Sequence, residues 1–484
     1  MTPEHFDVLV VGAGLSGIAA GYHLQANCPR RTYAILEARD AIGGTWDLFR
    51  YPGIRSDSDM YTLGYSFRPW TGAKAIADGP SILEYVRDTA RAYGIDKKIR
   101  FGHRVVRASW SSKTARWTID VTRADTGETV QLTCNFVLWC SGYYDYAKGY
   151  TPDFPGTERF RGRIVHPQFW TDDIDYVDKR VVVIGSGATA VTLVPTLAEK
   201  AAHVTMLQRS PTYVLSRPAV DPLAHWLRGK VSDDTAYGLT RWKNVALGMA
   251  FFNFCRRFPD RAKKLIVGSV RQGLGRDFDV QTHFTPSYQP WDQRLCFVPD
   301  GDLFDAMKRG RADVVTDQIE AFTETGLLLR SGKTLDADLI VTATGLRLQL
   351  LGNATLEMDG KPVDMSKHLN YRGTMLSDVP NLAFAMGYTN ASWTLKCDLV
   401  CEFACRLLNH MERHGHRVCV ARRSAAGTHE EPLINFTSGY VQRSIASLPK
   451  QGARAPWRLY QNYLLDLLSL RHGRIRDGAI EFTD

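Results

Sequence analysis

The stretch Asp7-Val8-Leu9-Val10-Val11-Gly12-Ala13-Gly14-Leu15-Ser16-Gly17 decides the first half of the fold. A short apolar strand leads into the pattern GxGxxG, formed by Gly12, Gly14 and Gly17, and this predicts a tight turn that opens a helix. Glu37 ends the next apolar strand, about twenty residues further on. An acidic side chain at that point accepts hydrogen bonds from a ribose hydroxyl, so the stretch predicts a site for FAD or NAD.

A second glycine-rich turn, Gly185-Ser186-Gly187-Ala188-Thr189-Ala190, follows the apolar strand from Arg180 to Ile184. The strand after it, from Val204 to Gln208, ends in Arg209 and Ser210 rather than in an acid. A guanidinium at this position suits a 2′-phosphate, so the second turn predicts an NADPH site. Gly185, Gly187, Ala188 and Thr189 are the residues of the turn expected to approach the cofactor.

Two such turns in one chain predict an α/β fold with two Rossmann-type dinucleotide-binding domains, one for FAD and one for NADPH. The segment 339–345 is another buried strand ending in glycine, and it resembles the return strand of two-domain flavoproteins. We therefore expect a discontinuous FAD domain (1–145 and 341–484) and an NADPH domain (146–340). A helical insertion is expected at about 218–290, where the punctuated pattern differs from a βαβ repeat.

Composition favours a large soluble enzyme. The chain has 484 residues, 44% of them hydrophobic, and its nine cysteines include no CxxC pair. No secretory signal is visible, so we expect a reducing, cytoplasmic environment. Cys397, Cys401 and Cys405 follow a helical spacing, which indicates either a metal or redox cluster or, as we favour, a buried stripe of small residues.

The formal charge of +9 is spread along the chain, without any nucleic-acid-binding motif. Nucleic acid is therefore not an expected partner. The apolar run 245–252 is flanked by basic residues and is too short to span a bilayer. It indicates a core helix or an interfacial patch, so membrane association is expected to be peripheral at most. The sequence does not indicate an oligomeric state.

Two longer motifs narrow the chemistry. The segment from Phe160 through Gly162 and His166 to Trp170 fits FxGxxxHxxxW, and the block from Gly44 to Asp57 fits GxWxxxx[FY]PGxxxD. Both are fingerprints of type I Baeyer–Villiger monooxygenases, which the chain resembles over almost its whole length. The stretches 43–70, 184–195 and 291–296 are especially similar to the ethionamide-activating flavoprotein monooxygenases of that family.

The resemblance implies an FAD-containing enzyme that uses NADPH and O₂ to convert ketones to esters or lactones through a C4a-peroxyflavin, and that also oxidises sulfides or thioamides. It assigns the catalytic arginine to Arg294 and the acid that orients it to Asp57. Gly44, Thr45, Trp46 and Asp57 would lie against the cofactor. Gln293 stands where many relatives have a lysine for the 2′-phosphate, so we expect a weaker preference for NADPH.

The fingerprint residues Phe160, Gly162, His166 and Trp170 are expected to lie in a linker away from the flavin, where they would couple NADP binding to domain rotation. The expected substrate is a small-molecule ketone or sulfide. Three alternatives stay open: a monooxygenase of nitrogen or sulfur atoms only, an NADPH oxidase that releases hydrogen peroxide, and a non-catalytic NADPH-sensing protein. The pocket is expected to be shaped by the insertion and by residues 388–393.

Overall fold

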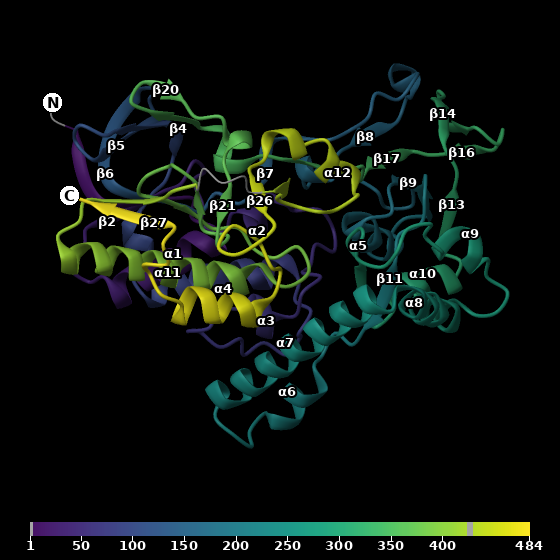
Figure 1. Cartoon of the computed structure of the whole chain (residues 1–484). Coiled ribbons are helices and arrows are strands. Elements are labelled where there is room, and N and C mark those ends of the chain that lie inside the picture. The colour runs from purple at the N-terminus through teal and green to yellow at the C-terminus, as the bar shows by residue number, and fades with distance from the viewer. Residues whose placement is uncertain (1–2, 424–428) are drawn as a thin grey trace.

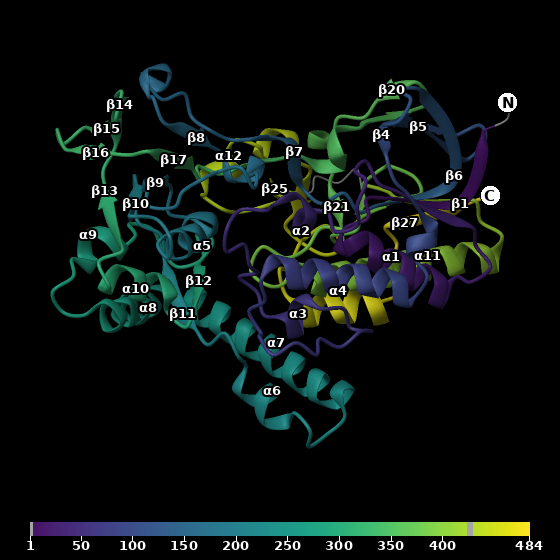
Figure 2. The same cartoon turned by 180° about the vertical axis from the view of Figure 1, so that it is seen from behind.

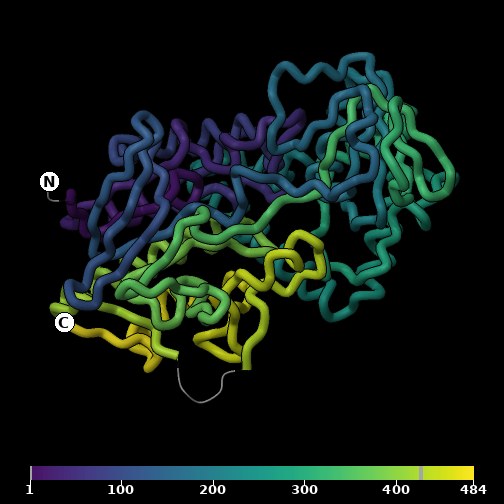
Figure 3. The backbone as a smooth tube through the Cα atoms, turned by 90° about the horizontal axis from the view of Figure 1, so that it is seen from above, coloured from purple at the N-terminus to yellow at the C-terminus, as the bar shows by residue number. Residues whose placement is uncertain are grey.

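The computed structural model describes residues 3–423 and 429–484. Two sheets, each containing the strand that leads into one glycine-rich turn, belong to two halves of the molecule that lie side by side. Both termini belong to the first half (Figures 1 and 3). None of the helices in the described residues combines the length and apolar character needed to cross a membrane.

The first sheet has nine strands, and its core is the parallel group β3-β2-β1-β6 with β23 pairing on β6. Antiparallel strands extend it on one side. The strands of this sheet are β1 (Glu4–Val11), β2 (Tyr33–Leu36), β3 (Ile99–Arg100), β4 (His103–Ser111), β5 (Arg116–Arg123), β6 (Thr129–Trp139), β19 (Thr355–Met358), β20 (Lys361–Pro362) and β23 (Leu382–Phe384).

Helices α1 (Leu15–Asn27), α4 (Gly79–Ala92) and α11 (Trp393–His414) accompany this sheet (Figures 1 and 2). Cys397, Cys401 and Cys405 are buried on α11, and the thiol of Cys397 accepts a hydrogen bond from Ser16 of α1 at 3.2 Å. No group of metal-binding side chains occurs in the described part of the chain. The burial of all three cysteines on α11 matches the stripe of small residues that we favoured.

The second sheet is entirely parallel, as expected for a sheet that helices cover on its faces. Its order is β13-β10-β9-β17-β8, and its strands are β8 (Arg163–Val165), β9 (Arg180–Ile184), β10 (His203–Gln208), β13 (Ala312–Thr316) and β17 (Leu339–Thr342). Helices α5 (Ala188–Leu197) and α10 (Asp302–Lys308) pack beside it, and a three-stranded sheet, β14 (Ile319–Phe322), β15 (Gly326–Leu329) and β16 (Thr334–Asp336), lies at its end (Figure 1).

Two strands connect the halves. β7 (Tyr144–Gly149) leads out of the first half, β18 (Leu346–Leu348) returns to it, and they pair antiparallel. Strand β17 thus ends directly before the return, and first-sheet strands lie on both sides of the second-sheet segment in the sequence. The exact domain limits given above stay a prediction.

The insertion is helical. It lies between the paired strands β11 (Val214–Arg217) and β12 (Cys296–Pro299), and its helices are α6 (Pro222–Leu227), α7 (Asp233–Arg257), α8 (Pro259–Leu274) and α9 (Val280–Phe284). Helix α6 and the first part of α7 project below the body (Figures 1 and 2). The segment 245–252 lies in α7 and is buried on one face only: Val245 is buried, but Leu247 is 61% exposed. The prediction of a core helix is therefore wrong for the outer face of this segment.

The remaining short elements belong mainly to the first half. They are α2 (Thr45–Leu48), α3 (Met60–Leu63), the strand pairs β21 (Asn370–Tyr371) with β22 (Met375–Leu376), β24 (Val418–Ala421) with β27 (Ile480–Thr483) and β25 (Glu430–Pro432) with β26 (Lys450–Gly452), α12 (Gly439–Gln442), and α13 (Tyr463–Asp466), which continues as a π-helix over Leu467–His472.

Candidate active site

A cavity of about 1600 Å³ lies between the two halves, where β1 and β9 end in their glycine-rich turns. Ligands of open α/β sheets bind at this edge, because the helix N-termini and the loops converge there. The predicted cofactor and catalytic residues that line the cavity are Gly12, Gly14, Glu37, Gly44, Thr45, Trp46, Asp57, Gly185, Gly187, Ala188, Thr189, Arg209, Ser210, Gln293 and Arg294.

The first turn is tightly built. Gly12 has φ +102°, and a Cβ at Gly17 would stand 1.8 Å from the carbonyl oxygen of Gly12, so α1 can approach β1 only with glycine there. Gly17 therefore lies behind the cavity wall and supports the turn. The Glu37 carboxylate accepts hydrogen bonds from the backbone N–H of Ala13 at 2.7 Å and of Arg39 at 2.9 Å.

These two bonds orient Glu37 at the cavity edge. The side chain is buried, and burial raises its carboxyl pKa, while the two backbone N–H groups favour the charged form. A carboxylate has about four acceptor positions, so two backbone bonds leave room for ribose hydroxyls. The geometry is that expected of a nucleotide-binding acid.

The second turn is more open. Gly187 and Ala188 are exposed, as are Arg209 and Ser210 at the end of β10. The hydroxyl of Ser186 donates to the backbone oxygen of Ser210 at 3.1 Å, which ties the turn to the strand end. A cation beside the N-terminus of α5 forms a suitable environment for an anionic group.

The middle glycine of each turn tests whether a dinucleotide fits. Gly14 and Gly187 have φ of −80° and −78°, which any residue can adopt. A Cβ at Gly14 would meet only ordinary contacts, the nearest atom being 3.5 Å away, and at Gly187 it would meet no protein atom within 4 Å. Neither glycine is thus required by the protein itself. A pyrophosphate against the helix N-terminus accounts for both.

An unpaired polar atom points the same way. Ser141 lines the cavity, and its hydroxyl oxygen is buried. This oxygen has no hydrogen-bond partner among the described residues. Buried polar atoms in proteins almost always have partners, so a ligand group is expected to supply this one. The residues present therefore fit an FAD-sized cofactor in the first half.

The block from Gly44 to Asp57 joins the two halves. Gly53 packs against α5, where a Cβ would stand 2.0 Å from the Thr196 hydroxyl oxygen. Arg55 forms an ion pair with Asp302 at the start of α10, with a second N–O distance of 3.3 Å. The block is therefore a contact segment between the halves.

Arg294 and Asp57, 237 positions apart, meet in this cavity. Nε of Arg294 lies 3.0 Å from one Asp57 carboxylate oxygen, and a terminal guanidinium nitrogen donates to the other at 3.1 Å. This is the fork geometry of a bidentate pair. The side chains are 32% and 24% exposed, so both still face the cavity. The Asp57 carboxylate raises the pKa of Arg294, which outweighs burial, and the guanidinium stays charged.

Three tyrosines surround this pair. Tyr143 and Tyr144 follow β6, their hydroxyls are 3.4 Å apart, and Tyr440 comes from α12. Burial raises the pKa of Tyr143 and Tyr440, and that of Tyr144 to about 12, so the phenols stay neutral near the Arg294 cation. The ring of Tyr143 contacts that of Trp393 at 4.9 Å between centroids.

Sequence reasoning missed the three tyrosines, whereas Trp393 lies in the segment 388–393 that was expected to shape the pocket. Tyr143 and Tyr144 could have been found, because they follow the carboxyl end of a strand that pairs with β1, where ligands of such sheets bind. No comparable signal exists for Tyr440. Its segment reaches the cavity only through packing, where the backbone N–H of Thr437 donates to the Asp292 carbonyl at 2.9 Å.

The fingerprint residues lie outside the cavity lining. Phe160 and Trp170 are buried in two cores of the second half, and Gly162 allows close approach to the Asp338 carbonyl. His166 contacts the connecting strands: its Nε2 lies 3.0 Å from the Gly345 carbonyl oxygen, and its ring lies against Gly149. Their suggested role in domain rotation stays a prediction.

A fold with two dinucleotide-type turns that face one cleft defines a flavoprotein class, and comparison with known proteins identifies its family. Residues 76–224 match the family described as flavin-binding monooxygenase-like, and residues 10–76 match the NAD(P)-binding Rossmann-like domain. The chain is 55% identical to the FAD-containing monooxygenase EthA of Mycobacterium tuberculosis (strain CDC 1551 / Oshkosh), over 99% of this chain and 98% of the relative. The chain belongs to the FAD-containing monooxygenases.

Two solved structures share the fold. The oxidized steroid monooxygenase bound to NADP has a TM-score of 0.76 at 22% identity, covering 99% of this chain and 100% of that one. Cyclohexanone monooxygenase from Rhodococcus sp. Phi1 bound to NADP+ has a TM-score of 0.74 at 20% identity, covering 100% of both chains. The predictions of an α/β fold with two Rossmann-type domains, of the family, and of an oxidoreductase are confirmed.

Proposed function

We propose that this protein is an NADPH- and O₂-dependent Baeyer–Villiger monooxygenase that converts ketones to esters or lactones and also oxidises sulfides or thioamides. The observation that carries the proposal is the bidentate pair of Arg294 and Asp57 in the cavity between the two turns. Such chemistry builds negative charge on oxygen away from water, and a fixed cation stabilises that charge.

FAD would bind at the first turn, with Glu37 at the ribose, Gly14 at the pyrophosphate and Ser141 as a further hydrogen-bond donor. NADPH would bind at the second turn, with Arg209 and Ser210 at the 2′-phosphate. When bound, these cofactors supply the reducing electrons and the activation of O₂.

The chain's own contribution begins with Arg294. Its guanidinium is held by Asp57 in one orientation and keeps donors free for the cavity, since a guanidinium has five N–H groups. It would stabilise the negative oxygen that develops from the substrate carbonyl. Asp57 is a positioning residue in this scheme, because it acts through the arginine.

The aromatic residues would bind the organic substrate. Tyr143, Tyr440 and Trp393 present apolar ring surface beside the cation, and this suits an uncharged ketone or thioether better than a charged metabolite.

The test is to incubate the purified flavoprotein with NADPH, ¹⁸O₂ and one cyclic ketone, one linear ketone or one thioether. We expect esters or lactones that carry one labelled oxygen, with NADPH consumed in equal amount. Sulfoxide without ester would favour the heteroatom monooxygenase. Stoichiometric hydrogen peroxide would favour an oxidase, and nucleotide binding without oxygen uptake would favour an NADPH-sensing protein.

A further inference from the structure

The exposed large apolar side chains are unevenly distributed. Among the residues that the structure describes, seventeen large hydrophobic side chains are exposed. Twelve of them lie in two segments, 220–265 and 460–468. Scattered exposed apolar residues are normal in proteins, but a concentration of them marks an interaction surface.

Helix α7 shows the two kinds of face clearly. Tyr237, Arg241 and Val245 recur at four-residue spacing and are buried, whereas Leu239, Trp242 and Leu247 are 53%, 49% and 61% exposed. Ala246 and Ala250 are exposed as well. At 3.6 residues per turn these residues form an outer stripe that is apolar although it faces solvent.

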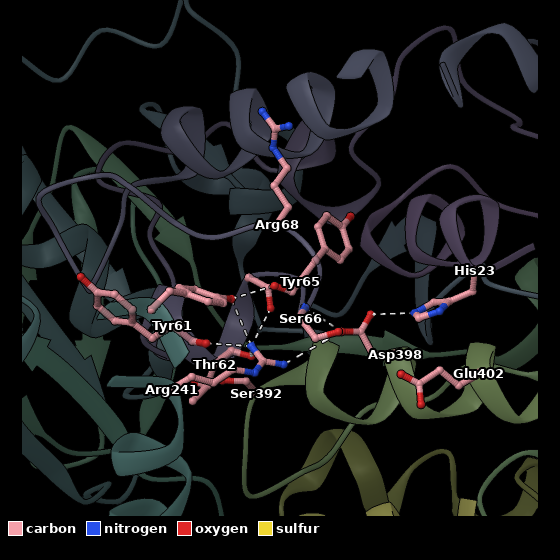
Figure 4. A network of polar contacts seen from close by, with 12 residues as sticks. His23, Tyr61, Thr62, Tyr65, Ser66, Arg68, Arg241, Ser392, Asp398 and Glu402 are labelled. Carbon is pink, nitrogen blue, oxygen red and sulfur yellow. Dashed lines mark hydrogen bonds and ion pairs between the residues drawn. The ribbon is translucent and has the colours of Figure 1, made fainter. Parts of the chain in front are cut away.

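The inner face is locked by a buried charge network, so the outer stripe cannot turn inward (Figure 4). Arg241 donates to the carbonyl oxygens of Tyr61 at 2.7 Å and Gly64 at 2.9 Å, and it lies 4.0 Å from Asp398, which also faces His23 at 3.6 Å. Removing a buried guanidinium from such partners is costly, so α7 keeps this orientation.

A second helix continues the apolar surface. Leu464, Leu465 and Leu468, on α13 and the following π-helix, are 44%, 45% and 59% exposed. This segment meets α7 where the rings of Trp242 and Tyr463 lie 5.9 Å apart. Both views place the two helices on the same lower side of the molecule (Figures 1 and 2). We call the outer sides of α6, α7 and α13 with its π-helix the apolar underside.

Basic residues accompany this surface. The segment 221–257, which contains α6 and α7, has six Lys and Arg against three Asp, a net charge of +3. Arg241 is buried, whereas Arg228, Lys230, Arg256 and Arg257 are exposed. Lys230 lies over the ring of the 60% exposed Trp226 at 4.1 Å. Exposed aromatic rings beside cations are typical of helices that lie in a membrane interface.

We propose that the apolar underside is a docking surface for a bilayer that contains anionic lipids. The Trp and Leu side chains would enter the acyl boundary, and the neighbouring Lys and Arg would contact phosphate headgroups. A second copy of the chain is less suitable, because a twofold contact would bring two copies of the same basic region together. The proposal does not depend on the reaction assigned above.

The test is cosedimentation of the purified flavoprotein with vesicles of phosphatidylcholine alone or mixed with phosphatidylglycerol. We expect binding to the anionic vesicles, with a blue shift of tryptophan fluorescence, weaker binding to the neutral ones, and release by salt. The double variant Trp226→Ser/Leu247→Ser should weaken binding on the order of tenfold or more, because it removes two apolar side chains from the bilayer. Leu468→Ser should weaken it less.

Two control variants have comparable exposure elsewhere. Val177→Ser changes a 50% exposed side chain in the second half, and Lys113→Glu changes an exposed lysine in the first. Both should bind anionic vesicles like the wild type, and flavin content should be unchanged in all variants. Absence of binding to anionic vesicles, or equal binding by the double variant, would overturn the proposal. A dimer in sedimentation velocity that the double variant dissociates would overturn it in favour of a second copy.

Discussion

The two glycine-rich turns share a sequence pattern but differ in how the protein surrounds them. In the first turn α1 approaches so closely that only Gly17 fits, and Glu37 is buried and held by two backbone N–H groups. In the second turn Ala190 occupies the third position, while Gly187, Arg209 and Ser210 are exposed. An enclosed site slows exchange of its ligand, and an open one permits it. We therefore expect a resident FAD at the first turn and an exchanging NADPH at the second.

The largest effect should come from substituting the middle glycine of each turn. Gly14→Val should remove FAD and with it all activity, because the side chain would occupy the pyrophosphate position without a clash inside the protein. Gly187→Val, the matched change, should keep FAD bound and raise KM for NADPH. Absorbance at the flavin band and NADPH titration check both. If Gly14→Val purified with full flavin, the comparison of the two turns would fail.

Arg294→Ala tests the junction between the turns. Both nucleotides should still bind, since neither turn is altered, but ester formation should fall by about 10²–10³-fold, as when one preorganised donor to an oxyanion is removed. Remaining NADPH consumption should appear as hydrogen peroxide. Arg294→Lys, which keeps the charge, and Asp57→Ala, which keeps the cation, should both be milder. Near wild-type ester formation by Arg294→Ala would place the catalytic centre elsewhere.

Arg209→Ala should affect the open site alone. Loss of a charge-assisted contact to a phosphate costs about 1.5–3 kcal/mol, which would lower kcat/KM for NADPH relative to NADH by roughly 10–150-fold. Because Gln293 supplies no charge, we expect the wild-type preference to lie below that of relatives with a lysine there. The ratio of kcat/KM for the two coenzymes measures this. An unchanged ratio would mean that other residues recognise the 2′-phosphate.

The smallest effect concerns His166, beside the strands that connect the two sites. Burial lowers its pKa below the ordinary 6.5, and Nδ1 accepts from the N–H of Gln168 at 3.2 Å, which needs the neutral ring. The histidine of the unfolded chain binds the proton more readily than that of the folded protein. The contribution of His166 to the free energy of unfolding is therefore fully present above pH 6.5 and decreases as the pH falls below it.

Thermal unfolding at about pH 7.5 and about pH 5.5 measures this loss. His166→Gln should show a smaller drop in Tm between the two pH values than the wild type. His225→Gln, which changes an exposed histidine of the insertion, should behave like the wild type. Equal drops in all three proteins would show that His166 contributes no measurable pH dependence.

Much of the fold could be predicted because its signals are local. An apolar strand, a glycine-rich turn and the start of a helix lie within about a dozen residues, so the whole unit can be recognised from one short stretch of sequence. The Cys397–Cys405 stripe was predicted for the same reason, since helical spacing is a local property. The site was predictable only in part. Spacing and composition did not distinguish Arg294 from other arginines in loops. Its assignment as the catalytic arginine came from the family resemblance.

The sequence by itself determined the two nucleotide turns, the charge difference between Glu37 and Arg209, and the helical character of the insertion. The pairing of Arg294 with Asp57 was implied by the family resemblance, and the structure brings the two together across 237 positions. Only the tertiary structure decided that Tyr440 joins them and that one face of α7 stays exposed. The physical reason is that α7 carries apolar residues on both sides. Periodicity therefore cannot tell which side is covered, and the choice follows from where the buried Arg241 finds its partners in a distant part of the chain.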